Sequence, residues 1–279
     1  RESLDTKIRG KKDLSPLKVP YLGEVPSAGG KPHGMMACLK KHDKEVRHIV
    51  VTGKSNDAVN EAFRVLRTNL EYMGVDGGGN NGKCKVIAVT SANPGSGKTF
   101  VSINLAKVLA IKGKRVLVID LDIRKGSLSK TIGHTGNGIV DFLVGKTHEE
   151  NLFVKGVDDT PTLDAIGIGI VPPNPAELLS REKLDKFVNG LREYYDFIIL
   201  DCPPVEIVTD AKVINRLADM TIFVVRAGLL EKDELPNIQE YYDTDRYRNM
   251  AILLNGTDIH SGYGYHRYGY LYGYGYGNN

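Results

Sequence analysis

A glycine-rich turn between a strand and a helix constrains this chain more than any other feature. The apolar run at residues 86–90 predicts a buried strand, and the mostly apolar stretch at 101–110 predicts a helix. Between them lies Ser91-Ala92-Asn93-Pro94-Gly95-Ser96-Gly97-Lys98-Thr99. The backbone N–H groups of such a turn, together with the free N–H groups at the helix start, form a cradle for phosphate. The pattern therefore predicts a nucleotide-binding phosphate loop, and the alternative is an ordinary Gly/Pro connection.

Two side chains at the end of this loop have the chemistry that a bound nucleotide requires. Lys98 would reach the β- and γ-phosphates, and the hydroxyl of Thr99 would ligate Mg²⁺. Ala92 stands where the strict pattern has its first glycine. We therefore expect ATP or ADP with Mg²⁺ as the cofactors, contacted by Asn93, Pro94, Gly95, Ser96, Gly97, Lys98, Thr99 and Phe100.

Strands and helices alternate along the chain after residue 85. Such alternation, with strands that are almost wholly apolar, predicts an α/β fold with a mainly parallel sheet and helices on both faces. Ligands of such sheets bind at the carboxyl ends of the strands. The expected strands after the loop are 115–119, 163–166, 197–200, 221–225 and 250–254, and the expected helices are 56–73, 138–144, 147–153, 176–195, 210–217 and 235–242.

Three aspartates follow predicted strands, where a nucleotide–magnesium site needs carboxylates. Asp201 comes directly after the strand 197–200 and has the form of a Walker B carboxylate that holds Mg²⁺. Asp120 and Asp122 follow the strand 115–119, and alternate residues of an extended chain face the same side. The alternative role for Asp201 is that of a turn or helix-capping residue, and an isolated Asp-x-Asp is a weak signal.

Composition places the chain among soluble globular proteins. It has 279 residues, of which 41% are hydrophobic and 25% charged. Its three cysteines show no metal-binding spacing, which favours a reducing cytosol. No stretch of about 18 apolar residues is present, so we expect no membrane span.

The two ends of the chain differ in character from the middle. Residues 1–55 hold twelve Lys/Arg against six Asp/Glu, which indicates either a solvated arm or a juxtamembrane segment. Because the first residue is Arg1 rather than Met, we expect a piece of a longer protein. The expected organisation is a basic juxtamembrane segment at 1–45, a phosphate-loop domain at 46–260 and a flexible Tyr/Gly-rich tail at 261–279.

The predicted helix at 56–73 carries a charged face as well as an apolar one. Glu61, Arg64 and Arg67 lie within one arc of this helix. On the residues alone, the Glu61–Arg64 pair is an ordinary solvated salt bridge.

Tyrosine occupies half of the 14-residue run that begins at Tyr263. Glycine at many intervening positions has little to bury and a high ordering entropy, so a mobile tail is expected. Such a tail is either a sticky low-complexity segment or a set of phosphate acceptors. The candidate acceptors are Tyr263, Tyr265, Tyr268, Tyr270, Tyr272, Tyr274 and Tyr276.

Several of these motifs together resemble the bacterial tyrosine kinases, phosphate-loop proteins of the MinD/ParA-like type that are unrelated in fold to eukaryotic protein kinases. Residues 116–124 are similar to the family's Walker A′ motif, and the phosphate loop, the Asp201-Cys202-Pro203-Pro204 segment and the tyrosine tail match as well. So do the Pro-rich stretch 172–179 and the Glu61–Arg67 segment, which is similar to the family's oligomerisation helix. MinD and ParA proteins carry Lys where this chain has Asn93 and lack the tail.

The resemblance implies a protein-tyrosine kinase that uses ATP and autophosphorylates its tail between subunits. It implies Lys98, Asp120, Asp122 and Asp201 as catalytic residues, and Thr99, Asp122 and Asp201 as magnesium ligands. Asp120 would accept or orient the phenol proton, although Asp120 and Asp122 can exchange roles. Asn255 would contact adenine.

The resemblance also implies partners and a location. Glu61, Arg64 and Arg67 would join subunits into a homo-oligomeric ring at the cytoplasmic face of the bacterial inner membrane. The resemblance further implies a membrane activator region, either upstream in the same chain or in a separate one. It also implies control of exopolysaccharide or capsule synthesis. The rival interpretations are a partitioning-type ATPase switch without a protein substrate and a nucleotide-dependent scaffold. Nucleic-acid binding has little support, because basic and aromatic residues are not interleaved on one predicted face.

Overall fold

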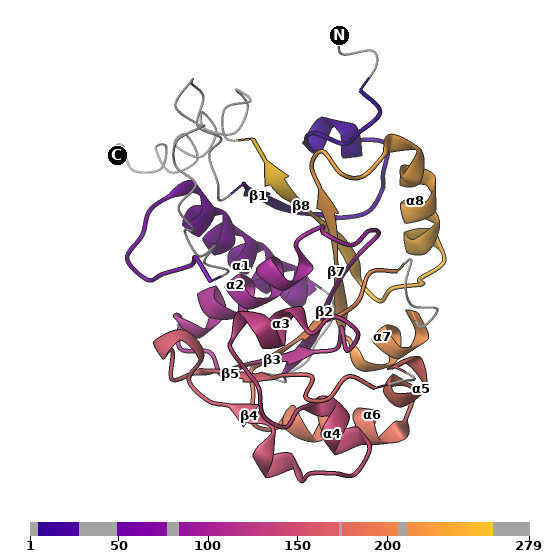
Figure 1. Cartoon of the computed structure of the whole chain (residues 1–279). Coiled ribbons are helices and arrows are strands. Elements are labelled where there is room, and N and C mark those ends of the chain that lie inside the picture. Colours follow the sequence, from indigo (N-terminus) through magenta and orange to yellow (C-terminus); the bar gives the residue numbers. More distant parts are fainter. Residues whose placement is uncertain (1–4, 28–48, 77–83, 173–174, 206–210, 259–279) are drawn as a thin grey trace, which may run out of the picture.

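The computed structural model describes residues 5–27, 49–76, 84–172, 175–205 and 211–258. These residues form one eight-stranded sheet with helices on both faces (Figure 1). The strands are β1 (Tyr21–Pro26), β2 (Lys85–Ser91), β3 (Val116–Asp120), β4 (Phe153–Val154), β5 (Leu163–Ile166), β6 (Phe197–Asp201), β7 (Met220–Arg226) and β8 (Met250–Thr257).

The strand order is β1-β8-β7-β2-β6-β3-β5-β4, and all neighbours are parallel except β4 and β5. β2, which carries the phosphate loop, therefore lies near the middle of the sheet. Its two neighbours are β6 and β7. The expected α/β fold with a mainly parallel sheet is confirmed.

The central strands are apolar on both faces because helices cover both. Along β2, Ile87 and Val89 belong to one buried apolar cluster, while Val86 and Ala88 belong to another. The first cluster is completed by α1 (Ala58–Asp76), α2 (Lys98–Ala110) and α3 (Ser127–Thr131). The second is completed by α4 (Ile139–Leu143), α5 (Pro175–Leu179), α6 (Glu182–Leu191), α7 (Ala211–Leu217) and α8 (Leu235–Asp243).

Residues 5–26 are attached to the edge of the sheet beside β8. β1 runs parallel to β8, with Tyr21 opposite Ile252. Before β1, the N–H of Ile8 donates to the carbonyl of Leu230 at 2.9 Å, and Ile8 is fully buried. The segment 1–45 was expected as a unit of its own. The structure adds that this part of it contributes a strand to the sheet, and the boundary at residue 45 stays a prediction.

Two expected helices differ from the structure. The stretch 176–195 forms α5 and α6 rather than one helix, because Arg181 has extended backbone angles and α6 begins after it. The stretch 147–153 contains only the 3-10 turn Glu149–Asn151 before β4. The first prediction was wrong because the apolar spacing continues across the break at Arg181. The second was wrong because only one short turn forms there.

Among the described residues, none of the helices combines the length and the apolar character that a bilayer crossing requires.

Candidate functional site

The phosphate loop follows β2 and ends where α2 begins at Lys98. Gly97, the residue before α2, has a φ of 89°, and Gly95 has a φ of 81°. L side chains rarely adopt these left-handed angles, so the two glycines fit the turn. The hydroxyls of Ser91 and Ser96 both donate to the carbonyl of Asn93 at 2.8 Å. The loop is therefore held in part by its own side chains, through this shared carbonyl.

Asp201 connects β6 to the start of α2. Its Oδ2 accepts a hydrogen bond of 2.6 Å from the Thr99 hydroxyl, and its Oδ1 accepts one of 3.1 Å from the Ser102 hydroxyl. Thr99 and Ser102 lie one helical turn apart, so both face the strand. The carboxylate expected from the sequence thus lies directly against the residue expected to ligate Mg²⁺.

Asp120 is the last residue of β3 and lies opposite Asp201 in the register of β3 and β6. Its Oδ2 accepts hydrogen bonds from the backbone N–H of Ser129, at 3.0 Å, and from the Ser129 hydroxyl, at 2.9 Å. Its Oδ1 is buried and has no hydrogen-bond partner among the described residues. One oxygen of a fully buried carboxyl group is therefore left for a ligand.

The buried charges of the site influence each other. Burial raises the pKa of Asp120 to about 7, and the nearby charge of Asp201 adds to the shift. Burial also raises the pKa of Asp201 to about 6, although the Thr99 hydrogen bond and the Lys98 charge oppose it. Burial lowers the pKa of Lys98, while Asp201 and Asp122 act to raise it. These mutual effects show that Lys98, Asp120, Asp122 and Asp201 lie in one electrostatic unit.

The oxygen ligands of the site suit a magnesium ion that arrives with a nucleotide. Within the described part of the chain, no group of three or more His, Cys, Asp or Glu side chains is placed to hold a metal ion by itself. Mg²⁺ in nucleotide sites uses one or two carboxylates, phosphate oxygens and waters. Thr99 and Asp201 are in contact and Asp122 lies nearby, so this donor set fits such an ion.

The residues on the other side of the loop hold it in place. The amide nitrogen of Asn255, in β8, donates to the carbonyl of Ser96 at 2.8 Å. Its expected contact with adenine stays a prediction. The ring of Phe100 packs edge-on against Phe63 of α1, with centroids 5.9 Å apart. The expected nucleotide contact of Phe100 stays a prediction as well.

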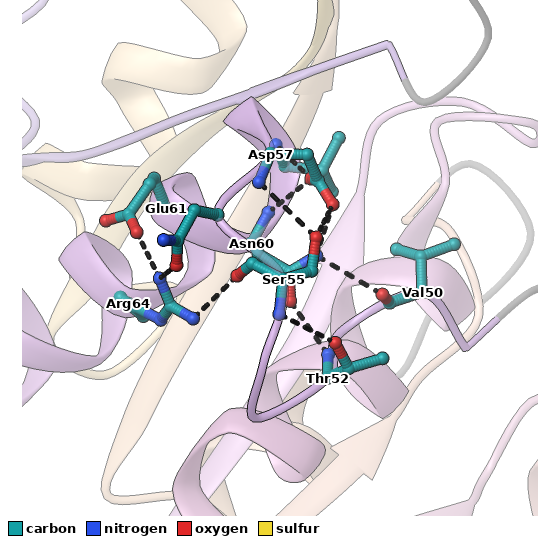
Figure 2. Close-up of polar contacts among 9 residues, drawn as sticks. Val50, Thr52, Ser55, Asp57, Asn60, Glu61 and Arg64 are labelled. Atoms are coloured by element: carbon teal, nitrogen blue, oxygen red, sulfur yellow. Dashed lines mark hydrogen bonds and ion pairs between the residues drawn. The ribbon is translucent and has the colours of Figure 1, made fainter.

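The expected oligomerisation residues lie on α1, and two of them are already paired within the chain. Arg64 forms an ion pair with Glu61 and donates to Asn56 and to the carbonyl of Ser55 (Figure 2). Arg67 lies on the same helix and is half-buried. An intersubunit contact through Arg64 would exchange these bonds for bonds to another copy.

The start of α1 is joined to α2 by a polar cluster, which we call the α1–α2 junction: the buried side chains of Asn60 and Asn104, the exposed Asp57 and the backbone of residues 50–52. The side-chain oxygen of Asn104 accepts hydrogen bonds from the N–H groups of Val50 and Val51, at 2.8 and 3.0 Å. Asn60 accepts from the N–H of Thr52 at 2.7 Å and donates to the carbonyl of Val50 (Figure 2). The helix that follows the phosphate loop is thereby fixed to the helix that carries Arg64.

Sequence reasoning missed Ser102, Ser129 and Asn104. Ser102 could have been found, because it follows Thr99 by one helical turn. Ser129 and Asn104 act across the fold, and nothing in the local pattern marks them. The seven tail tyrosines and the whole of the segment 28–48 lie outside the described residues.

Comparisons with known proteins agree on one family. A family model described as an AAA domain matches residues 84–240. Tyrosine-protein kinase YwqD of Bacillus subtilis (strain 168) is 32% identical over 83% of this chain and 96% of its own length. Putative tyrosine-protein kinase EpsB of Ralstonia solanacearum is 35% identical over 81% of this chain but only 30% of its own length.

Among solved structures, the kinase domain of the Escherichia coli tyrosine kinase ETK superposes with a TM-score of 0.75 at 27% identity. The match covers 97% of this chain and all of that one. This chain therefore spans nearly all of YwqD but less than a third of EpsB.

Proposed function

The chain belongs to the bacterial protein-tyrosine kinases, and on that premise we propose that it transfers the γ-phosphate of ATP to tyrosines in the tail of a neighbouring copy. The observation that carries the proposal is the pair Asp120 and Asp201. Two buried carboxyl groups lie side by side on β3 and β6 next to the phosphate loop, and Oδ1 of Asp120 has no partner among the described residues. A nucleotide-dependent scaffold has no need of this arrangement.

The side chains of the loop would bind and orient the triphosphate. Lys98 would balance charge on the β- and γ-oxygens, and Thr99, Asp122 and Asp201 would hold Mg²⁺. When bound, the ion would neutralise charge that develops on the phosphate oxygens. Because the transition state of phosphoryl transfer is loose, positioning and electrostatics contribute most of the rate.

Asp120 would receive or orient the proton of the incoming phenol through its Oδ1. A phenol has a pKa near 10, and burial has already raised the pKa of Asp120 to about 7. The raised pKa makes Asp120 a stronger base than an ordinary carboxylate, although a phenol still holds its proton more tightly. Asp122 stays the alternative for this role.

Charge would also regulate the assembly. Each phosphotyrosine adds about −1.5 to −2 charges, so a tail with several of them is strongly anionic. We expect it to leave the site and a ring held by Glu61, Arg64 and Arg67 to loosen. Light scattering before and after ATP addition tests this, and unchanged mass despite heavy phosphorylation contradicts it. Attachment to a membrane activator and control of polysaccharide synthesis belong to the same proposal.

A mixing experiment tests the central claim. One copy carries Lys98→Ala with its tail intact, and the other has a functional site but phenylalanine at all seven tail positions. After incubation with γ-labelled ATP, label on the first copy is expected, and mass spectrometry should locate it between Tyr263 and Tyr276. Release of free phosphate without labelled protein would instead indicate an ATPase switch.

A further inference from the structure

Two side chains lie beside the phosphate loop on the side away from the carboxylates. Arg226 is the last residue of β7 and lies opposite Asn255 of β8. In the strand order, β6 and β3 lie on one side of β2, whereas β7 and β8 lie on the other. The carboxyl edge of the sheet thus has an acidic half and a half that holds Arg226.

Glycines at two positions make room for these side chains. A Cβ on Gly97 would lie 2.2 Å from the amide nitrogen of Asn255 and 3.6 Å from Nη1 of Arg226. A Cβ on Gly256 would lie 3.7 Å from Cγ and Cζ of Arg226 and 3.8 Å from its Nε. The side chain of Arg226 therefore packs over Gly256, and its guanidinium reaches the last glycine of the phosphate loop.

Arg226 is half-buried, and its guanidinium forms no ion pair or side-chain hydrogen bond with any residue that the structure describes. By contrast, the partly buried guanidinium of Arg192 contacts Asp219 at 2.6 Å. A partly desolvated cation beside a phosphate cradle, with all its donors available, is expected to meet a ligand.

We propose that Arg226 is a nucleotide-binding residue and that its guanidinium plane lies against the purine ring of the bound nucleotide. The inference rests on the proposed function. Thr99, Asp122 and Asp201 would hold the metal beside the γ-phosphate on the β6/β3 half, so the nucleoside would extend over the β7/β8 half. There Arg226 presents a planar group, and arginine stacks on aromatic faces in a way that lysine cannot.

Binding measurements separate the nucleoside end from the phosphate end. Arg226→Met keeps the apolar stem and removes the plane and the charge. We expect its Kd for ADP to rise about three- to thirtyfold, the range of a cation–π contact, while inhibition of ADP binding by pyrophosphate stays unchanged. Arg226→Lys should not restore ADP affinity. The matched control is Arg115→Met, an exposed arginine at the amino end of β3, which should bind ADP as the wild type does.

Three results would overturn the inference. They are an unchanged Kd for ADP in Arg226→Met, an equal loss for pyrophosphate, and full restoration by Arg226→Lys, since the last two indicate charge acting on phosphate. Circular dichroism checks that each variant folds. If Arg226→Met does not fold, the ADP affinity of Arg226→Lys decides, and an affinity equal to that of the wild type overturns the inference. A wild-type protein that binds no ADP would refute the proposed function itself, which is a distinguishable outcome.

Discussion

Asn60 and Asn104 at the α1–α2 junction are as deeply buried as Asp120 and Asp201 at the carboxyl edge of the sheet. At the junction, every buried side-chain nitrogen and oxygen has a partner, whereas at the carboxyl edge Oδ1 of Asp120 has none among the described residues. The carboxyl groups differ as well. Burial acts to raise the pKa of Asp57, but hydrogen bonds from Ser55 and Asn60 outweigh it and lower the value. At Asp120 burial prevails and the pKa is raised.

The difference separates polar groups that hold the fold from polar groups that await a ligand. A satisfied buried network contributes rigidity, and a partly satisfied one costs free energy in the absence of its ligand. The junction should therefore affect stability and leave the chemistry intact, whereas the carboxyl edge should do the reverse.

The largest effect is expected from Asp201→Asn. Loss of a magnesium-binding carboxylate should lower the rate of tyrosine phosphorylation by about a thousandfold or more, roughly 4 kcal/mol of activation free energy. Thermal stability without nucleotide should stay equal or rise, because a buried charge is removed. Label transfer and thermal melting measure the two quantities. Asp219→Asn, at the amino edge of the sheet, should retain activity, and an active Asp201→Asn would end the assignment.

Asn104→Ala tests the junction. The N–H groups of Val50 and Val51 lose their common acceptor, and each unsatisfied buried donor costs about 1–3 kcal/mol. Denaturant unfolding should show a loss of roughly 2–4 kcal/mol, with the rate per folded molecule nearly unchanged. The exposed Asn237→Ala serves as control. If Asn104→Ala is as stable as the wild type but its phosphorylation rate falls, the junction is part of the site.

Stability without nucleotide and metal should also depend on pH through Asp120 and Asp201. Because their folded pKa values lie above those of the unfolded chain, the folded state binds more protons. Their contribution is largest near pH 4 and is lost as the pH rises through about 6 and 7. Each unit by which a folded pKa exceeds the unfolded value corresponds to about 1.4 kcal/mol, so the expected loss amounts to several kcal/mol. The free energy of unfolding of Asp120→Asn should change less with pH over this range than that of the wild type. An equal change in both proteins would contradict the assignment.

The smallest effect is expected from Asp57→Ala, which removes the cap of α1. Asp57 accepts hydrogen bonds from the N–H groups of Val59 and Asn60, both at 3.0 Å. Its loss should cost about 1 kcal/mol. Because the folded pKa of Asp57 is lowered, its contribution is present above pH 4 and is lost as the pH falls further, opposite to Asp120. A variant as stable as the wild type at pH 7 and at pH 3 would refute the capping role.

The sequence predicted the carboxyl edge better than the rest of the molecule. Lys98 and Thr99 lie at the start of a helix, and Asp201 lies at the end of a strand. Local sequence patterns identify both kinds of position, so their places in the fold follow once the parallel sheet is inferred. Ser129 and Arg226 become relevant only through contacts between elements distant along the chain. The spacing of apolar residues along the chain does not indicate such contacts.

The α1–α2 junction shows the other limit of sequence reasoning. Asn60 and Asn104 interrupt apolar helix faces. The sequence gives no reason for a polar residue at these positions, and the structure supplies one, because both asparagines bind the backbone of residues 50–52. Similarly, the break between α5 and α6 is invisible to apolar spacing, because Leu179 and Leu184 keep facing the same side of the sheet.

The parallel pairing of β1 with β8 has a mechanical consequence. A force that reached β1 at its amino end and was resisted at the carboxyl end of β8 would pull the two strands past each other. All their hydrogen bonds, from the pair Tyr21–Ile252 to the pair Pro26–Thr257, would then bear the load together as shear. An antiparallel edge strand pulled at its turn would peel away one bond at a time. This edge of the sheet is therefore a tension-resistant point of attachment.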